Sequence, residues 1–218
     1  MLPLRDHNPR HITPWVTYLL LIANLAIFIL ELIIGEAFIV EWSFIPARFL
    51  ENPIGQIPTL FTSMFMHAGW LHLLGNMLYL WIFGDNIEDR LGHVRFIIFY
   101  LICGLVATSS HLLFNLNSPI PSLGASGAIA GVLGAYIVMF PGARVRVLLG
   151  LFIIPLPAFV VIGGWIFLQL FYGVGSLTGP TDTSIAYMAH IGGFFAGLIM
   201  AIIFKTVNKR KTRSYWIN

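Results

Sequence analysis

The sequence predicts an all-α membrane protein, a compact bundle of six transmembrane helices with its N- and C-termini in the cytoplasm. Three observations lead to this prediction. Of the 218 residues, 58% are hydrophobic and only 10% are charged, whereas soluble domains carry about 25% charged residues. Several apolar runs approach or exceed the roughly 20 residues that a helix needs to cross a bilayer. Basic residues gather in every second connection between these runs, which is typical of a multi-pass protein.

Glycine, proline and charge divide the chain into apolar segments. The predicted spans are Trp15–Ile34, Thr59–Phe83, Phe96–Phe114, Gly124–Phe140, Val147–Tyr172 and Ser184–Phe204. We therefore expect one membrane domain at residues 15–204, a short cytoplasmic N-terminal tail at 1–14 and a basic cytoplasmic tail at 205–218.

The orientation follows from the Lys and Arg residues, because cytoplasmic connections are enriched in them. Only Arg48 falls in a segment predicted to lie outside. The residues predicted to lie inside are Arg5, Arg10, Arg90, Arg95, Arg144, Arg146, Lys205, Lys209, Arg210, Lys211 and Arg213. This bias places both termini in the cytoplasm, and an even number of spans agrees with it.

Two connections differ from plain loops. Gly35–Pro58 is long and apolar, so we expect it to lie in the membrane interface or to dip into the outer leaflet rather than to lie in water. Gly173–Thr183 is rich in Gly, Ser and Thr and is expected to be mobile. The net charge of +3 does not indicate nucleic-acid binding, because the basic residues flank apolar runs and form no stripe. The single cysteine, Cys103, is expected to be a packing residue.

Polar side chains inside a membrane span are expensive, so each one is a functional candidate. These candidates are His67, His72, Asn76, Ser126 and His190. Acidic residues lie in connections or tails, apart from Glu31 near the outer end of the first span, so we expect no buried acid. The chain has no HExxH spacing for a zinc protease and no pair of carboxylates within spans for an aspartyl protease. A serine with a histidine remains, and no metal or cofactor is expected.

Depth favours a pairing of Ser126 with His190. Each lies 14 residues before the predicted inner end of its span, at Phe140 and Phe204 respectively. At 1.5 Å per residue, both side chains sit roughly 21 Å above the cytoplasmic face, near the outer side. A hydrogen bond between a serine and a histidine requires this equal depth of the two side chains.

Glycine spacing favours a close approach of the two helices that carry this pair. Gly127, Gly131 and Gly134 share one face of the fourth span, and Gly193 and Gly197 share the face of His190. Small residues let membrane helices pack backbone to backbone.

The fourth predicted span is short, at about 17 residues and roughly 25 Å, so Ser126 sits at a helix start below the membrane surface. Irregular chain at that depth is tolerated inside protein or beside a water-filled cavity. The backbone N–H of Ser126 and the side chains of His72 and Asn76, four residues apart on one helix face, are candidate oxyanion donors.

At this point the sequence resembles the rhomboid family of intramembrane serine proteases. The resemblance rests on HAGWLHLLGN at residues 67–76, GASG at 124–127 and AHIGGFFAG at 189–197, in the family's order, and on EDRLG at 88–92. It covers Thr59 to Phe204.

The resemblance implies a rhomboid-like six-span fold and a Ser–His dyad without a third carboxylate. Ser126 is then the nucleophile and His190 the base, with His72, Asn76 and Ser126 lining the oxyanion hole. Gly124 shapes the turn before the nucleophile, Gly127, Gly193 and Gly197 shape the site, and His67 is structural. The implied partners are the lipid bilayer and transmembrane helices of substrate proteins, cut within or near the membrane from the extracytoplasmic side. The implied location is a prokaryotic plasma (inner) membrane. The oligomeric state is open.

Two positions depart from the family pattern. Many relatives carry an aromatic residue one turn after the nucleophile, where it supports the histidine, and this chain has Ala130 there. Tyr136 lies on a different turn and is no obvious substitute. In the first outer connection, Trp42 and Arg48 are not adjacent.

Two other functions stay open. A catalytically silent rhomboid-like adaptor that binds transmembrane helices is the main alternative, although the presence of both Ser126 and His190 argues against it. A small transporter using His67, His72 and His190 is the other, and the lack of an inverted repeat or a buried acid argues against that.

Overall fold

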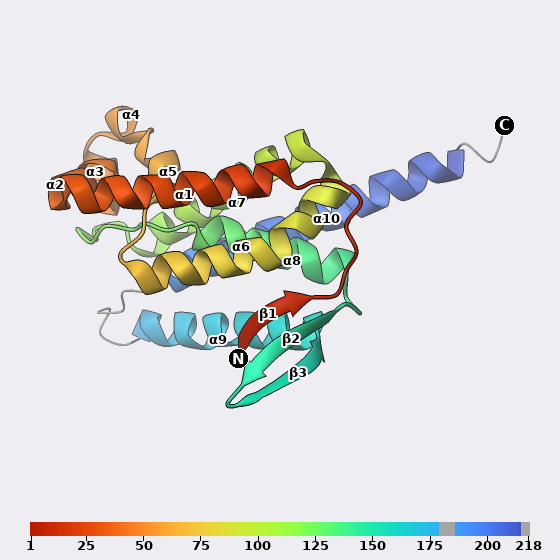
Figure 1. Cartoon of the computed structure of the whole chain (residues 1–218). Helices are drawn as coiled ribbons and strands as arrows, with labels where there is room; N and C mark the ends of the chain where they lie inside the picture. Colours follow the sequence, from red (N-terminus) through yellow and green to blue (C-terminus); the bar gives the residue numbers. More distant parts are fainter. Residues whose placement is uncertain (179–185, 215–218) are drawn as a thin grey trace.

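The fold is a bundle of helices with a small β-sheet at one end (Figure 1). The structure, a computed structural model, describes residues 1–178 and 186–214. Its long helices are α1 (Trp15–Ile34), α6 (Trp70–Leu91), α7 (His93–Phe114), α8 (Ser126–Met139), α9 (Ala158–Thr178) and α10 (Tyr187–Ser214). Helix α8 is the centre of the bundle, since α6, α7, α9 and α10 all pack against it. The short, glycine-rich sequence of α8 allows this burial on every side.

Four of the described helices are long and apolar enough to cross a membrane, namely α1, α7, α9 and α10. Helix α6 is long but less apolar, because Asp85, Glu88, Asp89 and Arg90 lie near its C-terminal end. Helix α8 has 14 residues, which gives it roughly 21 Å of length. The predicted shortness of the helix that begins at the serine is therefore found.

The prediction of a span at Val147–Tyr172 is wrong over residues 147–157. Strands β2 (Arg144–Leu149) and β3 (Phe152–Pro157) occupy this part, and α9 starts only at Ala158. Pro155 and Pro157 disfavour helix before Ala158, and Gly150, with a φ of +62°, turns the chain between the strands. The segment is apolar throughout, so hydropathy alone could not separate hairpin from helix.

The N-terminal tail also departs from expectation, because residues Leu2–Asp6 form strand β1. The sheet is antiparallel in the order β1-β2-β3, with Leu2 opposite Leu148. The described part of the chain is mostly helical, in agreement with the expected all-α class, and this small three-stranded sheet is an addition that was not predicted. Strand β1 is joined to α8, because the Tyr136 hydroxyl donates a hydrogen bond to the Asp6 carboxylate over 2.7 Å.

The second predicted span, Thr59–Phe83, is interrupted. Helix α5 (Thr59–Thr62) and a 3₁₀ turn η1 (Ser63–Phe65) come first, followed by an irregular stretch at residues 66–69. Helix α6 then starts at Trp70 and continues to Leu91, through most of what the sequence suggests is a connection. Gly92, with a φ of +76°, separates α6 from α7.

The apolar connection after α1 is folded rather than loose. It contains α2 (Glu36–Trp42), α3 (Pro46–Glu51) and α4 (Pro53–Gln56). The Arg48 guanidinium donates hydrogen bonds to the carbonyl oxygens of Val40, Glu41 and Ser43 at 2.7–3.2 Å, which satisfies carbonyls at the end of α2. Phe44 is fully buried. Whether this segment lies in the interface stays a prediction.

Two acidic residues are buried, contrary to the expectation that none is. Glu31 is 3% exposed and accepts the backbone N–H of His67 at 3.1 Å. Glu88 is 0% exposed and accepts the N–H groups of Val16 and Thr17 at 2.9 and 2.7 Å. Each carboxylate accepts hydrogen bonds from backbone N–H groups that a helix start or an irregular turn leaves unpaired. The positions of acidic residues in the sequence do not show which backbone donors lack a partner, so these buried acids were not predicted.

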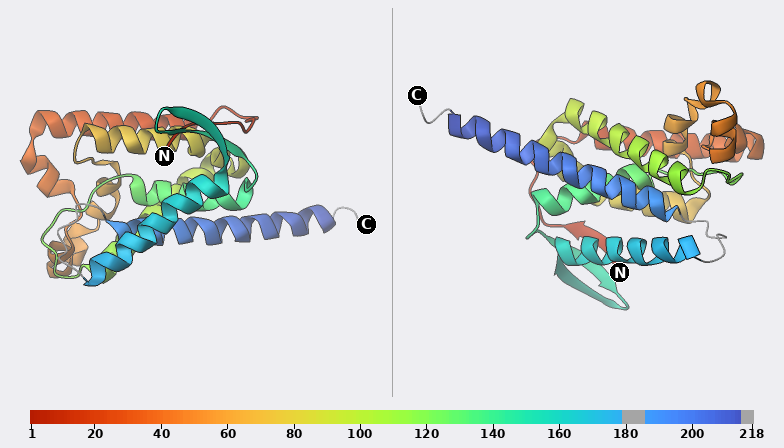
Figure 2. Two further views of the ribbon diagram at one scale, coloured as in Figure 1. Left: turned by 90° about the horizontal axis from the view of Figure 1, so that it is seen from below. Right: turned by 180° about the vertical axis from the view of Figure 1, so that it is seen from behind.

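The predicted C-terminal tail is helical over its first part, because α10 continues to Ser214 and extends beyond the other helices (Figure 2). Of the segment expected to be mobile, residues 173–178 belong to α9, and the remainder lies outside the described residues. The predicted start of the last span at Ser184 lies outside them too.

Candidate active site

Ser126 is the first residue of α8, and the chain before it is held in place by glycine. Gly124 has a φ of +131°, which side chains other than glycine rarely adopt, and its N–H donates to the Ser63 carbonyl oxygen at 2.8 Å. A Cβ atom on Gly124 would lie 2.8 Å from Cε1 and 2.9 Å from Nε2 of His72. Glycine therefore allows both the turn into α8 and the approach of His72.

His190 lies in the first turn of α10 and faces Ser126. Its Nε2 atom is 2.7 Å from the Ser126 Oγ atom, although 64 residues separate them in the chain. The structure thus brings together the two side chains that matched depth and helix direction predict to meet.

The close approach of α8 and α10 depends on glycine. A Cβ atom on Gly193 would overlap the carbonyl oxygen of Gly127, and one on Gly197 would overlap that of Gly131. In the other direction, a Cβ atom on Gly134 would overlap the carbonyl oxygen of Phe194. We call this contact the glycine seam. The predicted role of these glycines in helix approach matches their position.

His72 and Asn76 lie on one face of α6. The Ala68 N–H donates to Nδ1 of His72 at 3.4 Å, so the ring proton of a neutral His72 is on Nε2, the ring nitrogen that would lie 2.9 Å from a Cβ atom on Gly124. Asn76 is 8% exposed, and its side-chain nitrogen has no hydrogen-bond partner among the described residues. Helix α6 thus offers Nε2–H of His72 next to Gly124 and, one turn further on, an amide donor of Asn76 without a described partner.

The ring of His67 packs against that of His72. His67 is 1% exposed, and its ring centroid is 5.1 Å from that of His72. Its backbone is held by Glu31, so the irregular stretch before α6 has a fixed position. These contacts agree with the predicted structural role of His67.

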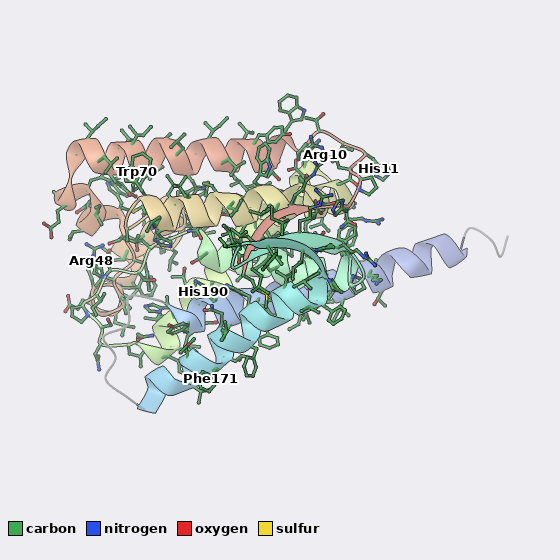
Figure 3. All side chains as sticks on the ribbon, turned by 60° about the horizontal axis from the view of Figure 1, so that its bottom comes forward. Arg10, His11, Arg48, Trp70, Phe171 and His190 are labelled. Carbon is green, nitrogen blue, oxygen red and sulfur yellow. The ribbon has the colours of Figure 1, made fainter. Side chains whose placement is uncertain are left out.

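Two residues that sequence reasoning missed contact His190, and both come from α9. The Gln169 Oε1 atom is 2.8 Å from Nδ1 of His190. The ring of Trp165, one helical turn earlier, has its centroid 5.7 Å from that of the imidazole. Ala130 is fully buried and offers no ring. Gln169 could have been found, because an uncharged polar side chain inside an apolar span is also a candidate. Figure 3 shows His190 beside α9.

A cavity of about 30 Å³, roughly the volume of one water molecule, adjoins Ser126. Its walls are mainly small side chains and glycine, with the hydroxyl-bearing residues Ser63, Thr108 and Ser122. A larger cavity of about 660 Å³ lies elsewhere, between strand β1 and α6, and includes Asp6 and Asp85 in its wall. Among the described residues, no group of three His, Cys, Asp or Glu side chains could hold a metal ion.

The chain is similar to known proteins over most of its length. The family model of the Rhomboid domain matches residues 55–206. Rhomboid protein 1, mitochondrial, of Saccharomyces cerevisiae is 34% identical over 157 residues, which is 69% of this chain and 43% of the yeast protein.

Two bacterial proteins match more of the chain. Rhomboid protease GluP of Bacillus subtilis is 31% identical over 192 residues, covering 87% of this chain and 35% of GluP. Rhomboid protease GlpG of Salmonella paratyphi A is 29% identical over 198 residues, covering 90% of this chain and 65% of GlpG. The chain therefore spans between about a third and two thirds of the length of these relatives.

Proposed function

The chain belongs to the rhomboid family, and from this premise we propose that it is an intramembrane serine endopeptidase with Ser126 and His190 as its catalytic dyad. The single observation that carries the proposal is the 2.7 Å contact between Ser126 Oγ and His190 Nε2. A hydroxyl is a weak nucleophile until an adjacent base accepts its proton, and this contact supplies the base. Two relatives, GluP and GlpG, are named as proteases.

In the proposed reaction, Ser126 Oγ attacks the carbonyl carbon of the scissile peptide while His190 Nε2 takes the hydroxyl proton. His190 then gives this proton to the departing amine, and an acyl-enzyme ester forms on Ser126. A water molecule, deprotonated by His190, attacks the ester, and the acid product and free serine result. The cavity beside Ser126 has room for about one water molecule.

The developing oxyanion needs donors aimed at it. Three donors are proposed: the backbone N–H of Ser126, Nε2–H of His72 and the side-chain amide of Asn76. The start of α8 supports the first, because the early N–H groups of a helix have no partner within it. The unpartnered, buried nitrogen of Asn76 and the contact of His72 with Gly124 support the other two.

The proposed substrates are membrane-anchored proteins cut within or near a transmembrane segment. The small cavity walls beside Ser126 favour small residues at the cut. A helical substrate must also unwind locally before a serine can reach its carbonyl groups, so helix-destabilising residues near the cut are expected. The partners are therefore transmembrane helices of substrates, within the bilayer.

Four apolar helices and the family membership make the chain an integral membrane protein. We propose that α6 and α8 span as well, giving six spans, with both termini cytoplasmic. Arg10 and His11 lie at the end of the bundle opposite Arg48 and Trp70, which supports this orientation (Figure 3). Ser126 then opens toward the extracytoplasmic side. A prokaryotic plasma membrane stays a proposal, since one relative is mitochondrial.

The test uses the full chain purified in detergent. A fluorophosphonate probe should label wild type and should not label Ser126→Ala. Reporters carrying a transmembrane segment with small residues at its outer end should be cleaved by wild type, and Ser126→Ala and His190→Ala should each lose at least about 10⁴-fold in cleavage rate. Ser109→Ala, at an exposed serine on α7, is the matched control and should behave as wild type. Undiminished cleavage by either dyad variant would refute the dyad. Absence of labelling in folded wild type would favour the silent adaptor.

A further inference from the structure

His190 is held at both of its ring nitrogens. Nε2 faces Ser126 Oγ at 2.7 Å, and Nδ1 faces the Gln169 Oε1 atom at 2.8 Å. The serine comes from α8 and the glutamine from α9, so the imidazole of α10 bridges two helices.

The chemistry of the glutamine fixes where the ring proton lies. A carboxamide oxygen only accepts hydrogen bonds, so Nδ1 beside it must carry the proton. Neutral histidine has one ring proton, and Nε2 is then left with a lone pair that can accept the Ser126 hydroxyl proton. The reverse placement, with the amide NH₂ toward Nδ1, would leave the proton on Nε2 and remove the base from the side of the serine.

The same contact acts once His190 has taken the serine proton. The imidazolium then carries a proton on both nitrogens, and the dipole of the Gln169 carbonyl faces the one on Nδ1. No described carboxylate contacts the dyad, since buried Glu31 and Glu88 bind backbone donors elsewhere. A neutral amide therefore occupies the place of the acid in a Ser-His-Asp triad.

Trp165 holds the ring from a second direction. It precedes Gln169 by four residues, so the two side chains share a face of α9. The indole and imidazole planes are inclined by 42°. The aromatic support that Ala130 cannot give from α8 thus comes from α9.

We propose that Gln169 is the positioning residue of the dyad, and that it holds His190 in the tautomer with its proton on Nδ1. The proposal rests on the proposed function for its catalytic consequence. Since Gln169 belongs to α9, the base is correctly set only while α9 lies against α10.

The experiment compares Gln169→Leu, which removes the acceptor at similar volume, with Gln169→Glu, which keeps one, and with wild type. Leu168→Ala, at an exposed neighbouring position of α9, is the matched control for helix packing. Gln169→Leu should lower kcat for a transmembrane reporter about 10- to 100-fold, the usual effect of a lost orienting partner, with little change in KM. Gln169→Glu should recover most of this loss, and Leu168→Ala should match wild type.

A second readout does not depend on proteolysis. In protein labelled with ¹⁵N-histidine, with the His190 signals identified by their loss in His190→Ala, wild type should show a protonated Nδ1 and an unprotonated Nε2. Gln169→Leu should show a mixture of both tautomers. A proton on Nε2 in wild type would overturn the proposal, as would wild-type kcat in Gln169→Leu or an equal loss in Leu168→Ala. If Gln169→Leu keeps the wild-type kcat while Ser126→Ala is inactive, only the positioning role of Gln169 is refuted. If Ser126→Ala is active, the proposed function itself is refuted.

Discussion

Helices α8 and α9 contact the same histidine but are packed in opposite ways. Every residue of α8 from Gly127 to Tyr136 is buried, and the glycine seam fixes α8 against α10. Helix α9 exposes Phe159, Phe167 and Phe171, and Cβ atoms on Gly163 and Gly164 would meet no atom within 4 Å. The proposed nucleophile Ser126 therefore sits on the most deeply buried of the described helices, while Gln169 and Trp165, which contact His190, sit on a more exposed one.

The largest effect is expected where the fixed contact is broken. Gly197→Ala places a methyl group against the Gly131 carbonyl oxygen, and backbone cannot move aside cheaply. We expect about 3 kcal/mol of lost stability and a separation of Ser126 from His190. Thermal unfolding in detergent and probe labelling measure the two effects. A variant as stable and as well labelled as wild type would contradict the tight seam.

The next largest effect is expected on kcat, at the proposed oxyanion donor Asn76. Asn76→Ala removes a buried donor that has no described partner to lose, so folding stability should change little. Loss of one oxyanion donor should lower kcat about 10²- to 10³-fold. Steady-state cleavage of the reporter and a melting curve measure this. Unchanged kcat would assign Asn76 to helix packing instead.

A smaller effect on stability is expected at Asp6, whose hydrogen bond from Tyr136 links the sheet to α8. Burial raises the pKa of the Asp6 carboxyl above its ordinary 3.8, despite the hydrogen bond from Tyr136. A raised pKa in the folded state means that ionising Asp6 lowers stability as the pH rises above 3.8. Asp6→Asn removes this loss, so its melting temperature relative to wild type should increase as the pH rises above 3.8 and should level off once Asp6 is ionised in the folded protein. A difference that shrinks with rising pH would show that the carboxylate stabilises the fold.

The smallest effect is expected on α9. Gly163→Ala meets open space and removes a flexible residue from a helix, so stability should stay constant or rise by up to about 1 kcal/mol. The paired melting curves of Gly163→Ala and Gly197→Ala therefore measure the contrast between the two helices directly. Equal destabilisation by the two variants would contradict the contrast between the helices.

The sequence predicted the helices best where apolar runs had clear borders. The span expected at Trp15–Ile34 is α1 with the same bounds, and that expected at Phe96–Phe114 differs from α7 by three residues. The prediction of a span beginning at Val147 was wrong, because an apolar hairpin and an apolar helix have the same hydropathy. Strand β1 was missed for a different reason, since its partner lies far away in the chain and five residues carry too little pattern.

The site was predictable to the extent that it depends on depth along a helix. Ser126 and His190 meet because each lies in the first turn of its helix, α8 or α10, and glycine marks the faces that approach. Gln169 was not predictable in this way. Its role depends on how far α9 is rotated about its own axis, and that rotation is set by packing rather than by residue spacing.

The pairing of β1 with β2 orders events during synthesis. Leu2 lies opposite Leu148, so strand β1 leaves the ribosome 146 residues before its partner. At about 5–20 residues per second, the N-terminal strand waits roughly 7–29 s while α1, α6, α7 and α8 are made. Closure of the sheet is therefore a late step that joins the first residues of the chain to helices already in place.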